Sequence, residues 1–160
     1  MIVVADTSVI LNLCRVQHEH LLPPLFGRVL IPHEVATEFV RLAGVDVRFA
    51  GLQLPAWIEQ MTAPPPPAVV IQANLDTGET AAISLCLVNR ADALLMDETL
   101  GRAVAAQLGL KAVGILGIVL AARRQGLIGA VEPVLDRLER DAGFWIAPSL
   151  RQRVLALAGE

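Results

Sequence analysis

Short apolar runs alternate with longer segments of helical periodicity along this chain. Four runs rich in Val, Ile and Leu read as strands: MIVVA (1–5), GRVLI (27–31), ALLM (93–96) and LKAVGI (110–115). Apolar runs of this kind are typical of strands that are covered on both faces. Because segments of helical character separate them, the pattern predicts an α/β fold with a mostly parallel sheet and helices on both faces.

The segments between and after these strands have helical periodicity. We predict helices over 8–16, 20–26, 32–44, from Asp76 to about Arg90, and over 99–109, 116–126, 130–143 and 147–160. Pro23 and Pro24 are expected to interrupt the second of these, and residues 48–69 are less regular, with Pro64 to Pro67 forming a surface connection. We expect one domain over residues 1–160, with the C-terminal helices from about 115 packed on the same core or on a partner.

Composition narrows the class of protein. Hydrophobic residues make up 54% of the chain and charged residues 18%, and the net charge is −3, with a pI near 5.6. We therefore expect no basic nucleic-acid patch, and the scarcity of aromatic residues argues against a base-stacking platform. No apolar stretch is long enough for a membrane span and the N-terminus lacks a signal-peptide pattern, so we expect a cytoplasmic protein without membrane contact. Cys14 and Cys86 are expected to be buried and reduced.

Acidic residues follow two of the predicted strands directly. Asp6 comes after the first strand, and Asp97 and Glu98 come after residues 93–96. Binding sites in open α/β sheets form outside the carboxyl ends of the strands. Asp is also a good helix N-cap, so a single acid at such a position can be purely structural.

A further acid lies on the helix predicted over 32–44. Val35, Phe39 and Leu42 form an apolar stripe on that helix, and Glu38 borders the buried face. Glu34 lies further round and is expected to be solvated. An ion pair between Glu38 and Arg41 is the structural alternative.

The stretch NLDTGETAAISL (74–85) supplies the fourth acid. Asp76 and Glu79 have the spacing of a capping box, in which both side chains satisfy backbone N–H groups of the first helical turn. Local sequence alone favours that reading. Once the acids of the other segments are considered, we assign Asp76 as the N-cap and Glu79 as an acid of the candidate site.

Asp6, Glu38, Glu79 and Asp97 would thus bring carboxylates from four segments together. Clustered carboxylates repel one another unless protons or a cation lie among them. Oxygen-only ligands select hard ions, Mg²⁺ or Mn²⁺. One or two such ions activate water and shield a phosphodiester, so these four acids are candidate catalytic residues as well as metal ligands.

The sequence resembles the PIN-domain family, and the resemblance covers nearly the whole chain. VVADTSVILNL, VLIPHEVATEFV, LDTGETAAISLC and LLMDETLGRAVAAQLGL follow one another as in a PIN protein, and GILGIVLAARRQGLI and RVLALAGE look like a subgroup related to toxin ribonucleases. The resemblance implies a three-layer α/β/α sandwich and a Mg²⁺- or Mn²⁺-dependent ribonuclease that cleaves single-stranded RNA. It also implies a small antitoxin as partner and, with the apolar composition, a homodimer.

The same resemblance carries roles to individual positions. Asp6 matches the first acid, Glu38 the second and Glu79 the third, where many relatives have Asp; Met96 stands where relatives often have Thr. Asp97 matches the fourth, with Glu98 as the alternative ligand. Thr7 or Ser8 is expected to support the first acid by hydrogen bonding. Arg102 is expected to orient Glu98 or contact phosphate, and a surface salt bridge is the structural alternative for this residue.

Two other functions compete with the nuclease. One is a PIN-like module that binds RNA or a protein partner with weak or no turnover, which the departures at Met96 and Glu79 favour. The other is a phosphoacceptor domain of the receiver type, which also carries acids at strand ends. Lys111 begins its predicted strand, so the late strand-end Lys of a receiver is missing.

Overall fold

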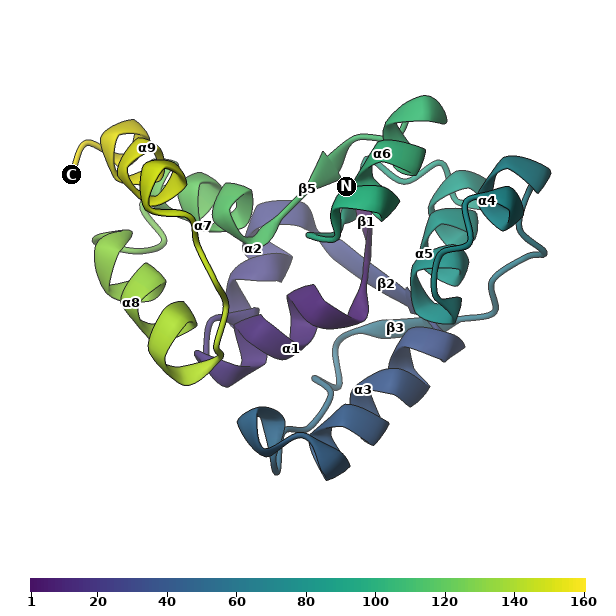
Figure 1. Cartoon of the computed structure of the whole chain (residues 1–160), viewed down its shortest axis with the longest axis horizontal. Coiled ribbons are helices and arrows are strands. Elements are labelled where there is room, and N and C mark those ends of the chain that lie inside the picture. Colours follow the sequence, from purple (N-terminus) through teal and green to yellow (C-terminus); the bar gives the residue numbers. More distant parts are fainter.

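A five-stranded parallel sheet forms the centre of the molecule (Figure 1). The structure, a computed structural model, describes residues 1–160. The strands are β1 (Ile2–Ala5), β2 (Arg28–Pro32), β3 (Glu59–Met61), β4 (Ala93–Leu95) and β5 (Ala112–Val113). They lie in the order β3-β2-β1-β4-β5, and every neighbouring pair is parallel. The predicted α/β class is confirmed.

Nine α-helices and two 3₁₀ turns connect and cover the strands. The 3₁₀ turns are η1 (Glu19–Leu21) and η2 (Val47–Phe49). The helices are α1 (Thr7–Arg15), α2 (Leu22–Phe26), α3 (His33–Val45), α4 (Ala68–Gln72), α5 (Thr77–Val88), α6 (Thr99–Gln107), α7 (Ile115–Arg124), α8 (Glu132–Asp141) and α9 (Pro148–Ala158). None of these helices is both long and apolar enough to cross a lipid bilayer.

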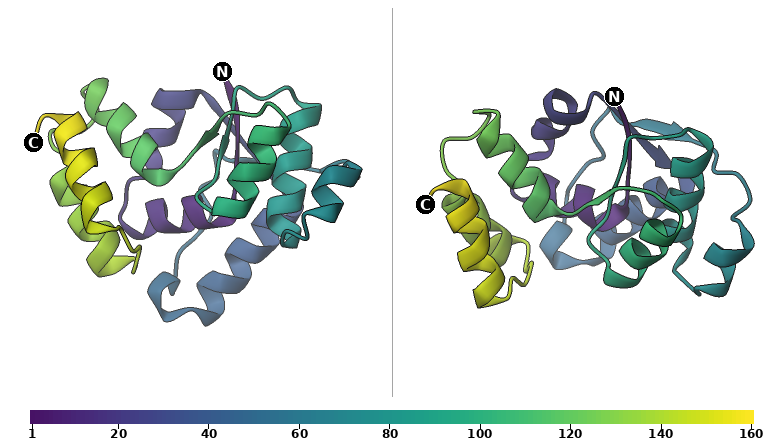
Figure 2. Two further views of the ribbon diagram at one scale, coloured as in Figure 1. Left: turned by 45° about the horizontal axis from the view of Figure 1, so that its top comes forward. Right: turned by 90° about the horizontal axis from the view of Figure 1, so that it is seen from above.

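Alternation along the strands divides the core in two. Val3 and Ala5 face a large hydrophobic cluster with residues of α1, α2, α3 and α7 to α9, whereas Val4 faces a smaller cluster with residues of α4, α5 and α6. Successive strand residues point to opposite faces, so both faces of β1 are buried. Figure 2 shows the resulting helix layers on either side of the sheet. The predicted three-layer α/β/α sandwich is confirmed.

The C-terminal helices share the larger cluster. Ile118 of α7, Leu135 of α8 and Val154 of α9 belong to the same set of buried residues as Val9 and Phe39. The loop between α8 and α9 is thereby held beside the carboxyl ends of the strands.

Two local expectations were wrong. The irregular segment 48–69 contains β3, a three-residue strand at the edge of the sheet. Its Glu59 and Gln60 are exposed and polar, so the strand lacks the apolar run by which the other strands were predicted. Pro23 and Pro24 do not interrupt a helix. They lie in the first turn of α2, where a backbone N–H has no helical partner to lose, so the helix begins there. Cys14 and Cys86 are buried free thiols, as expected.

The backbone conformation at Gly27, between α2 and β2, can be tested by substitution. Its φ is +76°, and a Cβ atom there would lie 2.7 Å from the Met1 carbonyl oxygen. Gly27→Ala should lower the free energy of unfolding by about 1–3 kcal/mol, measured by urea denaturation. Gly44→Ala is the matched control, because no atom lies within 4 Å of its Cβ position inside α3; it should raise stability by about 0.5–1 kcal/mol. Equal effects of the two substitutions would contradict the assigned backbone at Gly27.

Candidate metal centre

The candidate site lies where the strand order changes direction. The chain passes from β1 to β2 and β3 on one side of the sheet, then crosses to β4 and β5 on the other side. Ligands of open α/β sheets bind at this kind of switch point. Asp6 directly follows β1, and its backbone N–H donates to the Leu95 carbonyl at 2.9 Å. That bond ties the first acid to the strand that precedes Asp97 and Glu98.

A cleft of about 360 Å³ opens at this point. We call it the acid cleft, because five carboxylates from four segments of the chain line it: Asp6, Glu38, Asp76, Glu79 and Glu98. Of the four acids expected to cluster, three therefore share one cleft. The fourth, Asp97, lines a neighbouring cleft instead.

Glu38 is held by the start of α1. The Thr7 hydroxyl donates to Glu38 Oε2 at 2.9 Å, so the hydroxyl expected to support Asp6 supports the second acid instead. Ser8 contributes its backbone carbonyl, which accepts a hydrogen bond from the Asn12 side chain. No ion pair joins Glu38 to Arg41, which leaves the carboxylate free to face the cleft.

The start of α5 approaches Glu38 closely. A Cβ atom at Gly78 would lie 2.7 Å from Glu38 Oε2, so a larger residue there would displace the Glu38 carboxylate. Asp76 Oδ1 accepts the Glu79 backbone N–H at 2.7 Å, which confirms Asp76 as the N-cap. Glu79 makes no reciprocal capping bond. Its side chain is buried in the first turn, where the helix dipole favours a negative charge.

The two acids after β4 have different surroundings. Glu98 lines the acid cleft and accepts the Gly101 backbone N–H at 2.8 Å, which caps α6. Asp97 Oδ1 accepts the Ile115 backbone N–H at 3.0 Å, whereas its Oδ2 is buried without a hydrogen-bond partner. Arg102 donates to the Met96 carbonyl at 3.3 Å and lies close to Asp97.

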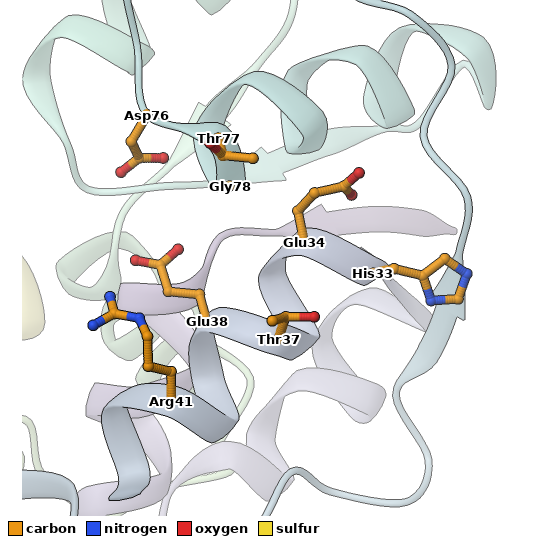
Figure 3. Close-up of a pocket in the computed structure, with 8 residues that line it drawn as sticks. All are labelled: His33, Glu34, Thr37, Glu38, Arg41, Asp76, Thr77 and Gly78. Carbon is orange, nitrogen blue, oxygen red and sulfur yellow. The ribbon is translucent and has the colours of Figure 1, made fainter. Parts of the chain in front are cut away.

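A second cleft of about 540 Å³ adjoins the acid cleft and shares Glu38 and Asp76 with it (Figure 3). We call it the α3–α5 cleft. In Figure 3 the carboxylates of Glu38 and Asp76 point to the same side, with Arg41 alongside. Glu34, which was expected to be solvated, is half-buried: it lines this cleft, while its Oε2 is buried without a hydrogen-bond partner.

Burial changes the acidity of the site. Desolvation raises the pKa of Asp6 from 3.8 to about 7, and the charges of Asp76, Glu38 and Asp97 add to that rise. Desolvation also raises the pKa of Glu79, followed by repulsion from Asp76, Asp6 and Glu98. The pKa of Asp97 is raised by burial although the Ile115 N–H and Arg102 act in the opposite direction. Each raised pKa means that the ionised carboxylate is disfavoured while no positive group lies beside it.

The donor set fits a hard divalent cation. All candidate ligands are carboxylate oxygens, the class that Mg²⁺ and Mn²⁺ prefer. The unpartnered buried Oδ2 of Asp97 and the raised pKa of Asp6 both indicate carboxylates that a cation would satisfy. No three acidic, His or Cys side chains lie close enough together to hold an ion as they stand.

Sequence reasoning missed several residues that shape the site. Asp76 lines the acid cleft besides capping α5, and the capping-box pattern suggested only the second role. Gly78 and Gly114 let the chain approach Glu38 and Asp97, respectively. The glycine between the two acids of DTGE indicates only weakly that the chain approaches another side chain there. Trp145 also lines the cleft, and no local pattern predicts that contact.

Comparison with known proteins identifies the family. The PIN-domain family DUF3368 matches residues 2–160, almost the whole chain.

The chain belongs to the PIN-domain family.

PIN domains are generally nucleases and typically use divalent metal ions. The fold is also similar to that of a PilT N-terminus domain protein from the hyperthermophilic archaeon Sulfolobus solfataricus P2. That structure matches with a TM-score of 0.50 and 20% identity, over 74% of this chain and 90% of its own. This second likeness concerns the fold alone. Among proteins of curated function, none matches the chain.

The raised pKa values predict how the stability of this PIN domain depends on pH. Between the unfolded value near 4 and about pH 7, the folded state holds protons that the unfolded state has lost. The free energy of unfolding in EDTA should therefore fall as pH rises through this window. Mn²⁺ should raise the melting temperature more at pH 8 than at pH 5, because the carboxylates are ionised at pH 8. Asp6→Asn should weaken both trends; equal stabilisation by Mn²⁺ at the two pH values would contradict this account.

Proposed function

We propose that this PIN domain is a Mg²⁺- or Mn²⁺-dependent endoribonuclease that cleaves single-stranded RNA. The observation that carries the proposal is the convergence of Asp6, Glu38, Glu79 and Glu98 on one cleft at the switch point, with Asp97 beside it. A bound cation would lower the pKa of a water molecule and shield the charge of the phosphodiester. One or two such ions suit the number of acids present.

Asp6 is the central ligand of the proposed site. Its carboxylate is buried at the end of β1, and its backbone is fixed to β4. Because Asp6 has a pKa near 7 without a positive partner, a cation would favour the ionised form. Removal of this charge should therefore weaken metal binding more than the loss of any exposed acid.

Glu38 and Glu79 would complete the set from opposite sides of the cleft. The Thr7 hydroxyl orients Glu38, as outer hydrogen-bond partners orient metal ligands generally. Glu79 is held by the first turn of α5, while Asp76 satisfies the backbone there. This division leaves the Glu79 carboxylate available to an ion.

For the fourth position we retain Asp97, with Glu98 as the alternative ligand. Asp97 has one oxygen held by the Ile115 N–H and the other without a partner, which supports a free ligand atom on a fixed carboxylate. Glu98 shares the cleft with the other acids, but one of its oxygens already caps α6. Arg102 lies next to Asp97 and can meet a phosphate group near it.

We further propose that residues 1–160 act as one domain, as the toxin of a toxin–antitoxin pair and as a cytoplasmic homodimer. The sequence resemblance of residues 114–128 to toxin ribonucleases motivates this assignment. Val40, Val45 and Val47 are exposed apolar residues along α3 and η2, and such residues favour contact with another polypeptide. The alternative is a PIN-like module that binds RNA or a protein partner without turnover.

Asp6→Asn tests the enzymatic proposal directly. The wild type should cut an end-labelled single-stranded RNA of mixed sequence when Mn²⁺ or Mg²⁺ is present and not in EDTA. Asp6→Asn should lower kcat/KM by about 100-fold or more, because a metal ion contributes several kcal/mol to the transition state. Glu59→Gln, which alters an exposed acid on the edge strand, is the control and should cut at the wild-type rate. Retained cleavage by Asp6→Asn would overturn the proposal, and RNA binding without cleavage by the wild type would favour the non-catalytic alternative.

Substitutions of Asp76 and Glu79 should have different effects, because one acid caps a helix and the other is proposed to bind the metal ion. Asp76→Ala should lower the free energy of unfolding by about 0.5–2 kcal/mol through loss of the cap, whereas Asp76→Asn should retain it. Glu79→Gln should weaken Mn²⁺ binding, measured by titration calorimetry, without lowering stability in EDTA at pH 8, because the raised pKa of Glu79 means that its charge opposes folding. An exchange of these two outcomes would reverse the assigned roles.

A further inference from the structure

Trp145 stands out among the side chains near the site because it is exposed. The indole is 79% exposed, in the loop between α8 and α9. The chain has only two Trp and four Phe and no Tyr. A large aromatic side chain usually gains stability by burial, so this one gains little for the fold of the single chain.

The loop position places Trp145 between two clefts. Trp145 and Phe144 line the acid cleft, and both also line a neighbouring cleft of about 630 Å³. We call the second one the Arg102 cleft, since Arg102 lies in it beside Asp97. Trp145 and Phe144 are thus the residues that the two clefts share, and a chain molecule that occupies both clefts passes beside them.

The Arg102 cleft has the chemistry of a nucleotide site. Six of its eleven lining residues are hydrophobic, including Leu116 and Leu150, which suits a base or a sugar. Arg102 forms no ion pair in the chain, and its one hydrogen bond, to the Met96 carbonyl, is long at 3.3 Å. Its remaining guanidinium donors are free for a phosphate.

The α3–α5 cleft extends the same path in the other direction. It joins the acid cleft through Glu38 and Asp76, and Arg41 lines it without an ion-pair partner (Figure 3). Three joined clefts thus run past the acids, with an arginine toward either end. Acidic surroundings repel a phosphate backbone, so cations at the flanks are needed to hold one there.

We propose that Trp145 stacks against a base of the bound single strand, next to the phosphate that faces the acid cleft, while Arg102 contacts an adjacent phosphate. This inference rests on the proposed nuclease function and adds its substrate-positioning residues. One indole is not the extended platform that the composition argues against. It is enough to fix one base, and stacking on an aromatic ring tolerates any base.

The path also indicates why the ligand is single-stranded. A base inside a duplex has both faces covered by its neighbours, so it cannot stack on a side chain without leaving the helix. An exposed indole could instead meet a protein surface, such as a second copy of this chain. Direct continuity with the acid cleft and the nearby free arginine favour the nucleic acid.

The two tryptophans allow each to be observed alone. In an Asp6→Asn background, Trp57→Phe leaves Trp145 as the only indole, and Trp145→Phe leaves Trp57, which lies in the loop before β3. Titration with short oligo(A) or oligo(U) RNA should quench the emission of Trp145 and leave that of Trp57 unchanged. Duplex RNA of the same length should quench neither. Equal quenching of Trp145 by duplex, or no quenching by the single strand, would overturn the inference.

Cleavage kinetics supply a second readout. Trp145→Ala should raise KM for single-stranded RNA by about 5- to 150-fold, the range for loss of one stacked base, with little change in kcat. Trp145→Phe should restore most of the affinity. Trp145→Leu keeps an apolar side chain but no aromatic face, and should behave like Trp145→Ala. Unchanged melting temperatures verify folding, and a full rescue by Leu would reduce Trp145 to an apolar contact and overturn stacking.

The outcomes separate this inference from the proposed function. If Asp6→Asn abolishes cleavage while Trp145→Ala changes neither KM nor oligonucleotide affinity, the nuclease assignment stands and the inference fails. If the single strand quenches Trp145 but the wild type does not cleave with Mn²⁺, the inference stands and the enzymatic proposal fails. Conversion of a dimer into a monomer by Trp145→Ala, seen by light scattering with unchanged RNA affinity, would assign the indole to contact between copies and overturn the inference.

Discussion

The parallel pairing of β1 with β4 is the constraint on which the site depends. Val3, Val4 and Ala5 lie opposite Ala93, Leu94 and Leu95, and the next backbone bond joins the Asp6 N–H to the Leu95 carbonyl. This register places the first acid beside the residues that follow β4. A slip by one residue would turn Val4 toward the wrong hydrophobic cluster, so packing on both faces of the sheet fixes the register. The chemistry is therefore positioned by apolar side chains that take no part in it.

Around that register, backbone groups and hydroxyls fix the acids one by one. The Thr7 hydroxyl holds Glu38, and the Ile115 amide holds one oxygen of Asp97. Asp76 and Glu98 each cap a helix that begins at the site. These bonds offset part of the like-charge repulsion in a partly buried cleft, because each gives one of these four carboxylates a favourable partner. Asp6 and Glu79 gain least from such bonds, and theirs are the pKa values that burial raises most clearly.

Strands and candidate acids could be predicted from the sequence where the local pattern of apolar residues matches the burial in the fold. β1 and β4 are apolar runs followed at once by acids, so both the strands and their strand-end carboxylates were identifiable. Glu38 was identifiable from its place beside the apolar stripe of α3. The edge strand β3 was not, because two of its three residues are exposed and polar. The Thr7–Glu38 bond and the position of Trp145 depend on contacts between distant segments, which no local periodicity encodes.

The bond between Ile115 and Asp97 also bears on the order in which the site can form. The first acid is near the start of the chain, and the amide that fixes Asp97 comes more than a hundred residues later. β2, one neighbour of β1, follows it closely in the chain, but the other neighbour, β4, emerges only after α5. Contacts between such distant segments form slowly, since a long loop must close before they can stabilise the fold. During vectorial synthesis the acid cleft therefore stays incomplete until the loop after α8 has emerged, because residues 142–145 also line it. A nascent chain that ends before Ile115 also lacks the amide that fixes Asp97, so the assembly of the site coincides with completion of the fold.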